Sequence, residues 1–220
     1  MTDLDRNTLM NGSFVKFFEG TPQLEDWTEE MIEQSMLEFL AQRNKTEPVW
    51  IFAYGSLICN PLFKFEEKYL AELDGWKRSF CIRLIIARGS LNQPGRMLAL
   101  IPGGRTGGVA LKLYEQNLFS ELKLVWMREM IGGVYQPVWE TIRLENGKNV
   151  QAIVFAANPN HDLYETDDRV DTIVPFISTA YGILGSNLDY VVKLHEALSK
   201  LEIKDPYIQQ LAGALKQENH

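Results

Sequence analysis

The pattern of hydrophobic positions predicts helices towards both ends of the chain and short strands between them. Residues 1–24 show no clear period and are interpreted as a loosely held arm. From Asp26 to Arg43 apolar residues recur at helical spacing, and Asp26 with Glu29 three residues later can form a capping box. Residues 49–57 form a continuous apolar run, VWIFAYGSL, which predicts a buried strand ending in a Gly-Ser turn.

The middle of the chain predicts several short strands separated by glycine and proline. Two strand-like pieces lie in residues 66–88, on either side of an Asp74-Gly75 turn. Two more, at 96–101 and 107–114, are expected to form a glycine-rich hairpin. Residues 138–154 form the clearest hairpin pattern, because two strand-like runs flank Asn146-Gly147, a pair that favours a type I′ turn.

Helical spacing returns in the second half of the chain. The expected helices are 117–130, ended by Gly132-Gly133, then 166–181 with a kink or new start at Pro175, then 187–200, and 206–216 capped by Asp205. The order of elements is typical of an α+β fold. We expect a small closed or strongly curved, mostly antiparallel β-barrel with helices packed outside it.

Composition sets the broad class of protein. The chain has 220 residues, of which 45% are hydrophobic and 23% are charged, as in ordinary globular proteins. Its two cysteines, Cys59 and Cys81, are too few for a disulfide framework or a zinc knuckle. Residues 1–24 carry acidic side chains where a signal peptide would be basic, and no apolar run is long enough to span a membrane. We therefore expect a soluble cytoplasmic protein without membrane insertion.

Charge is distributed unevenly along the chain. The net charge of −7 argues against a nucleic-acid partner. Residues 75–114 nevertheless contain seven Lys or Arg side chains and no Asp or Glu, so the other residues together carry −14. Arginine side chains match carboxylates and phosphates, which suggests a site for a small anion. The alternative is that these cations are solvated or pair with acidic elements elsewhere.

Several motifs that could carry chemistry fail closer inspection. The run Gly103–Gly108 lacks the Lys-Ser/Thr ending of a phosphate loop and does not open a helix. The three histidines show no metal-ligand spacing. Cys59 has no surrounding signature of a thiol hydrolase, and a small packed side chain is the simpler interpretation. We expect neither a metal nor an organic cofactor.

Two features remain as candidates. The Tyr54-Gly55-Ser56-Leu57 turn presents consecutive backbone N–H groups, which can hold a carboxylate or a developing oxyanion; an ordinary strand end is the alternative. Glu129 lies at the predicted C-terminal end of a helix, where the helix dipole disfavours a carboxylate and burial would raise its pKa towards values useful for proton transfer. The alternative is an exposed glutamate screened by Arg128.

In combination, the motifs of this chain resemble the ChaC family of γ-glutamylcyclotransferases in its bacterial form. The resemblance covers about residues 48–215. It rests on segments that follow one another in order: Ile51–Ile58, Gly75–Phe80, Arg88-Gly89, Pro94-Gly95-Arg96, Arg128-Glu129-Met130 with Tyr135, and Gly185–Tyr190.

The resemblance implies a function and a site. Such proteins act on glutathione and release 5-oxoproline and Cys-Gly on a small barrel with flanking helices. Glu129 matches the family's catalytic glutamate, and Arg88 and Arg96 become candidate clamps for the carboxylates of glutathione. Tyr135 is either a pocket or a core residue, and Asn187 and Tyr190 are interpreted as structural. The segment that matches the substrate loop consists of Ala53, Tyr54, Gly55, Ser56, Leu57 and Ile58.

Two positions depart from the family pattern, and two other functions stay open. Ala53 stands where the family often has glycine, and Cys59 where it often has tryptophan, which affects the rim of the pocket more than the chemistry. The alternatives are a non-catalytic regulator of ion transport and a cyclotransferase for other γ-glutamyl amines. Residues 1–47 are expected to form an arm and a helix, and residues 48–220 a single domain. No feature predicts an oligomeric state.

Overall fold

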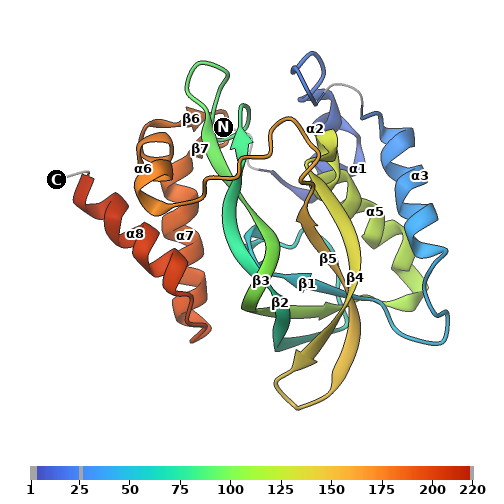
Figure 1. Cartoon of the computed structure of the whole chain (residues 1–220). Coiled ribbons are helices and arrows are strands. Elements are labelled where there is room, and N and C mark those ends of the chain that lie inside the picture. The colour runs from blue at the N-terminus through green and yellow to red at the C-terminus, as the bar shows by residue number, and fades with distance from the viewer. Residues whose placement is uncertain (1–3, 25–26, 219–220) are drawn as a thin grey trace.

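The barrel is the centre of the fold. A computed structural model describes residues 4–24 and 27–218 (Figure 1). Five strands close into a barrel in the order β1-β3-β2-β4-β5, in which β1 pairs antiparallel with β3 and parallel with β5. The expected closed, mostly antiparallel barrel is therefore confirmed. The strands are β1 Trp50–Ala53, β2 Glu67–Leu84, β3 Gly95–Lys112, β4 Tyr135–Leu144 and β5 Asn149–Ala157.

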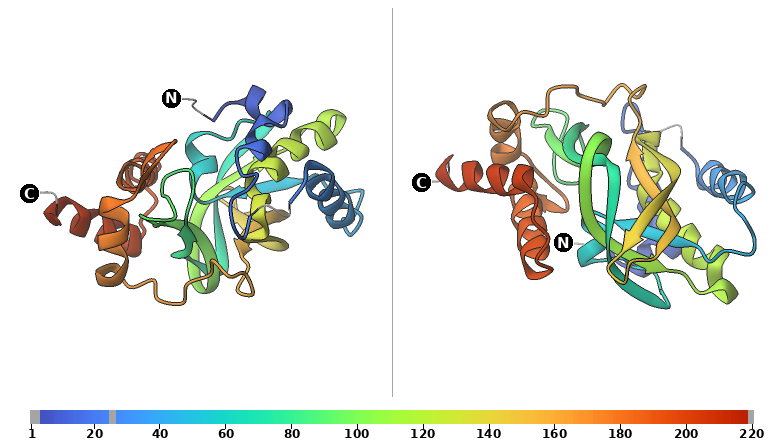
Figure 2. Two further views of the ribbon diagram at one scale, coloured as in Figure 1. Left: turned by 90° about the horizontal axis from the view of Figure 1, so that it is seen from above. Right: turned by 60° about the horizontal axis from the view of Figure 1, so that its bottom comes forward.

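Helices cover the barrel on two sides, as Figures 1 and 2 show. Helices α1, α2, α3 and α5 lie against one side, and α6, α7 and α8 lie against the other. A short two-stranded sheet, β6 Tyr181–Gly182 with β7 Gly185–Ser186, precedes α7. The helices are α1 Arg6–Met10, α2 Ser13–Lys16, α3 Glu29–Leu40, α4 Ser56–Cys59, α5 Leu118–Glu129, α6 Val170–Thr179, α7 Asn187–Lys200 and α8 Pro206–Glu218, with 3₁₀ turns at Glu115–Asn117 and Ile131–Gly133.

Side chains of strand β1 pack against both layers of helices. Successive side chains of a strand point to opposite faces. Ile51 and Ala53 belong to the apolar cluster shared with α3 and α5, whereas Trp50 and Phe52 belong to the cluster shared with α6, α7 and α8. The apolar run in the sequence is continuous because both faces of this strand are covered.

The two glycine-rich turns predicted in the barrel strands are wrong. Strand β2 continues through Asp74-Gly75, and β3 continues through Gly103–Gly108, with Asp74 paired to Arg105. The β2–β3 register shifts next to Gly75, whose φ of +84° is a conformation that favours glycine. Such a bulge bends a strand without ending its pairing, so these glycines curve the barrel.

The N-terminal residues are packed more firmly than expected. Leu9 and Phe18 are buried, and Phe14 and Phe17 pack against the same cluster. Because these side chains pack on the body of the protein, the expectation of a loosely held arm is wrong. The predicted Asp26 cap lies outside the described residues.

The other predicted elements agree with the structure apart from their ends. The β4–β5 hairpin turns at Asn146-Gly147, and Asp205 caps α8 by accepting a hydrogen bond from the Ile208 N–H at 3.0 Å. The strand predicted to reach residue 57 ends at Ala53, because α4 begins at Ser56. The helix expected from residue 166 begins at Val170 and contains Pro175 without a break.

Candidate active site

A cavity of about 540 Å³ lies where the end of α5 and the start of α4 meet the last residues of β2 and the first residues of β3. Six residues predicted for the site line it: Gly55, Ser56, Arg88, Arg96, Glu129 and Tyr135. Cys59, which departs from the family pattern, also lines the cavity. The remaining predicted residues, Ala53, Tyr54, Leu57 and Ile58, lie behind this surface or beside it. The structure thus brings the turn and the glutamate together in one cavity.

Glu129 is the last residue of α5, and its carboxylate is almost completely enclosed. Its side chain is 12% exposed, and among the described residues the buried Oε1 atom has no hydrogen-bond partner. Arg128 Nε lies 3.2 Å from Oε1, without the alignment of a hydrogen bond. Burial raises the pKa of Glu129, and the neighbouring charge of Arg128 lowers it by less. The carboxyl group is therefore suited to exchange a proton with a ligand.

The turn after β1 places Gly55 at the start of α4. The first N–H groups of a helix have no partner within it, so Ser56 and Leu57 can present theirs to a ligand. The Ile58 N–H, in contrast, donates to the Gly55 carbonyl at 3.0 Å. A methyl group on Gly55 would lie 3.2 Å from both the Tyr190 hydroxyl and the Leu98 side chain, so the backbone approaches the cavity wall closely.

The turn is held from behind by Arg78, which sequence reasoning did not single out. The Arg78 guanidinium donates to the Tyr54 carbonyl at 2.9 Å, the Gly107 carbonyl at 2.6 Å and Asp205 at 2.8 Å. Tyr54 is itself buried and donates its hydroxyl to the Phe155 carbonyl. Tyr54 and Arg78 therefore fix the turn rather than face the cavity.

The cations of residues 75–114, the segment without Asp or Glu, support both interpretations made from the sequence: some line a site for an anion, and others pair with acidic side chains elsewhere. Arg83, Arg88 and Arg96 line the cavity, and Arg96 also lies 3.8 Å from the Glu165 carboxylate, whereas Arg105 and Lys112 pair with acidic side chains elsewhere. Arg128 and Lys193 add two more cations to the lining, in which Glu129 is the only acidic side chain among the described residues. An excess of cations around one carboxylate favours an anionic ligand.

Arg88 and Arg96 are both held by the segment around α7. Arg88 donates to the Ser186 carbonyl at 3.0 Å, and the Arg96 N–H donates to the Asn187 side chain at 2.7 Å. Arg96 is buried, lies over the Phe176 ring at 4.5 Å, and leaves Nε without a partner within the described part of the chain. Burial lowers the pKa of Arg96. Asn187 is structural, as expected.

Two tyrosines complete the polar part of the wall. Tyr135 on β4 is buried and donates to the Leu98 carbonyl at 2.6 Å. Tyr190 on α7 also lines the cavity, which the sequence analysis missed. Burial raises the pKa of both hydroxyls, so both remain protonated near neutral pH.

Within residues 4–24 and 27–218, no group of three or more His, Cys, Asp or Glu side chains is arranged to hold a metal ion. None of the helices in those ranges combines the length and apolar character that crossing a membrane requires.

The fold defines the class of protein. A solved structure of a γ-glutamylcyclotransferase specific to glutathione from yeast matches with a TM-score of 0.71 and 20% identity, over 78% of this chain and 96% of that one. The chain therefore has the barrel fold of that protein, with a glutamate and a glycine turn facing one cationic cavity.

The family follows from the sequence comparisons. A family model described as ChaC-like protein matches residues 49–218. The glutathione-specific γ-glutamylcyclotransferase of Escherichia coli (strain K12) is 44% identical over 97% of this chain and 92% of its own length. Glutathione-specific γ-glutamylcyclotransferase 1 of Danio rerio is 31% identical over 76% of this chain and 88% of its own length. The chain belongs to the ChaC-like family.

Proposed function

We propose that this protein is a glutathione-specific γ-glutamylcyclotransferase that converts glutathione into 5-oxoproline and Cys-Gly, with Glu129 as its general acid and base. The observation that carries the proposal is the enclosed carboxylate of Glu129, which shares a cavity with the Gly55-Ser56 turn and has one oxygen without a hydrogen-bond partner in the described part of the chain. The names of the two curated relatives supply the substrate.

The charge of the cavity suits this substrate. Glutathione carries two carboxylates, and the cavity presents an excess of guanidinium and ammonium groups. In the proposal, Arg88 and Arg96 hold carboxylates of the peptide, and the N–H groups of Gly55, Ser56 and Leu57 hold the glutamyl carboxylate or the oxyanion of the tetrahedral intermediate.

The reaction is an intramolecular aminolysis. The α-nitrogen of the γ-glutamyl group attacks its own γ-carbonyl carbon, a C–N bond forms to close a five-membered ring, and the bond to the cysteinyl nitrogen breaks. Both reacting groups belong to one molecule, so the pocket contributes mainly by holding the folded conformation in which they meet. The cations that line the cavity can hold the folded glutathione through the carboxylates at its two ends.

Protons must pass between the two nitrogens. The substrate ammonium group becomes the ring N–H, and the departing amide N–H becomes the ammonium group of Cys-Gly, so two protons move from one nitrogen to the other. A single carboxylate placed between the nitrogens can accept each proton and return it. In the proposal Glu129 does this, and its raised pKa brings it closer to the pKa values of the groups it serves.

The reaction as written balances without a metal or an organic cofactor. The proposal places it in the cytoplasm with a small-molecule substrate and no nucleic-acid partner. Cys59 and Cys81 are both free thiols, as a reducing compartment allows.

Product analysis tests the proposal directly. Purified protein is incubated with glutathione in the presence of a chelator, and 5-oxoproline and Cys-Gly are quantified by mass spectrometry. Equal amounts of the two products are expected. Release of glutamate instead of 5-oxoproline, or no turnover, would overturn the proposal. Parallel assays with γ-glutamyl-alanine and oxidised glutathione define the range of substrates.

A further inference from the structure

The N-terminal segment, residues 4–24, forms part of the cavity wall although it lies outside the matched residues 49–218. It contributes apolar side chains only, whereas the cations of the cavity come from other parts of the chain. The cavity is therefore polar on one part of its wall and apolar on another. The contributing side chains are Leu4, Phe14, Phe18 and Leu24.

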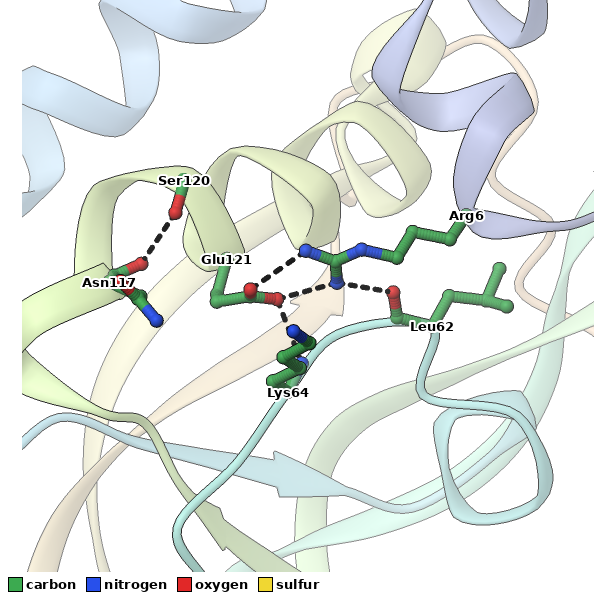
Figure 3. Close-up of polar contacts among 6 residues, drawn as sticks. All are labelled: Arg6, Leu62, Lys64, Asn117, Ser120 and Glu121. Atoms are coloured by element: carbon green, nitrogen blue, oxygen red, sulfur yellow. Dashed lines mark hydrogen bonds and ion pairs between the residues drawn. The ribbon is translucent and has the colours of Figure 1, made fainter.

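An ion pair between a buried carboxylate and the partly exposed side chain of Arg6 holds this segment in place (Figure 3). Arg6 on α1 donates two hydrogen bonds to the Glu121 carboxylate, at 2.6 and 2.7 Å, and one to the Leu62 carbonyl at 3.1 Å. The Lys64 N–H donates to the same carboxylate at 2.8 Å. The side chain of Glu121 is 3% exposed. This one carboxylate joins the N-terminal segment to the helix that carries Glu129 and to the chain that follows α4.

Further contacts place the segment next to the reacting groups. The Asn60 side chain donates to the Leu4 carbonyl at 3.4 Å, and the Asn60 carbonyl accepts a hydrogen bond from Arg128. A methyl group on Gly132, three residues after Glu129, would lie 2.1 Å from the Leu24 side chain. The segment therefore contacts Asn60, which is bonded to Arg128 of α5, and the turn at Gly132 just after α5.

The ring contacts within the segment make its cavity face stiff. The Phe14 and Phe18 rings meet edge to face at 5.1 Å, and Phe17 meets Phe18 in the same way at 5.3 Å. Phe18 and Leu24 are buried. A packed aromatic surface of this kind can restrict the size of what lies against it.

We propose that the N-terminal segment selects the amine part of the substrate, with Phe14 and Phe18 enclosing the side chain next to the scissile amide. The inference rests on the proposed function. The γ-glutamyl group carries an α-carboxylate, which complements the cationic wall, whereas the cysteinyl side chain is a small apolar group. The apolar wall fits this side chain and leaves little space for a larger one.

Substrate competition tests the inference. Phe14→Ala and Phe18→Ala are compared with the unchanged protein by 5-oxoproline release from glutathione and from γ-glutamyl-leucine. We expect the ratio of kcat/KM for γ-glutamyl-leucine to that for glutathione to rise at least about tenfold, since even one methylene more or less in a hydrophobic pocket changes such discrimination about 10- to 200-fold. A ratio that stays within about twofold of the original in a folded variant overturns the inference.

Variants of the ion pair give a second, independent test. Arg6→Ala should raise KM for glutathione while kcat changes less, because the N-terminal segment loses its ion pair with Glu121 but Glu129 remains in place. Arg43→Ala is the matched control, since the Arg43–Glu115 pair has the same 2.6 Å contact and neither residue lines the cavity. Equal effects of the two substitutions on KM would overturn the role of the Arg6–Glu121 pair.

The controls separate the two proposals. An unchanged protein that releases no 5-oxoproline from any γ-glutamyl amide contradicts the proposed function, whereas turnover with an unaltered selectivity ratio contradicts only the inference. Titration of glutathione into Glu129→Gln, alone and combined with Phe14→Ala, gives a Kd without turnover, and we expect the added substitution to weaken binding. Phe14→Leu serves where the alanine variant does not fold.

Discussion

Arg78 donates its Nε–H to the Tyr54 carbonyl over 2.9 Å, and both residues are buried behind the cavity. This contact fixes the backbone immediately before Gly55. This guanidinium has acceptors just after β1, on β3 and just before α8, and it therefore also joins the barrel to the helical layer of α6, α7 and α8. The position of the turn therefore depends on a side chain that does not line the cavity.

Removing Arg78 should destabilise the whole fold. Arg78→Ala leaves the Tyr54 and Gly107 carbonyls and the Asp205 carboxylate without their donor, and breaking such a buried pair costs about 3–5 kcal/mol. Urea denaturation measures the change in the free energy of unfolding. Arg105→Ala is the control, because its pair with Asp74 is more than half exposed and should contribute at most about 1 kcal/mol. Similar losses for both variants would contradict the assigned role of Arg78.

Adding a methyl group at Gly55 should impair activity more than stability. In Gly55→Ala the new carbon would lie 3.2 Å from the Tyr190 hydroxyl and from Leu98, so one of these neighbours must move by a few tenths of an ångström. We expect kcat/KM for glutathione to fall at least about tenfold, because small displacements at a site of this kind are costly. Gly213→Ala, in α8 with open space around it, is the control and should stabilise the protein by about 0.5–1 kcal/mol. Full activity in Gly55→Ala would show that the close approach is unimportant.

The raised pKa of Glu129 predicts a specific effect of pH on stability. Because burial raises the pKa in the folded state, the folded state favours the protonated acid, and stability is lost as the pH rises through the folded pKa. Each unit by which the pKa is raised corresponds to about 1.4 kcal/mol. Glu129→Gln removes the cost of burying the charge, so it should melt at a higher temperature than the unchanged protein at about pH 8. The difference should vanish in acid, below the ordinary pKa of a glutamate. A lower melting temperature for Glu129→Gln at about pH 8 would contradict a net cost of burying this carboxylate beside Arg128.

The sequence alone predicted elements whose signals are local. Asn146-Gly147 predicted the β4–β5 hairpin correctly, although only Gly147 has a positive φ, so the turn is not the type I′ form that the pair favours. Asp74-Gly75 carries the same signal and lies within a continuous strand. The difference is set by β3, which pairs with β2 on both sides of Gly75, and this distant partner cannot be recognised from the dipeptide.

The sequence likewise identified some residues of the candidate site and missed others. The resemblance drew attention to Glu129 and the Gly55-Ser56 turn, which spacing alone left with ordinary structural explanations. Tyr190 and Phe14 were missed as wall residues because an apolar or aromatic side chain follows the same pattern whether it faces a core or a cavity. Their role depends on how α7 and the N-terminal segment dock on the barrel, and only the assembled fold shows it.

The turnover of Glu129→Gln with glutathione tests the central claim most directly. Glutamine keeps the size of the side chain and cannot exchange the proton, so kcat should fall by about 10²–10⁴-fold while glutathione still binds. Glu140→Gln on β4, whose side chain does not line the cavity, should retain the activity of the unchanged protein. A kcat for Glu129→Gln equal to that of Glu140→Gln would contradict the assignment of Glu129 as the acid and base.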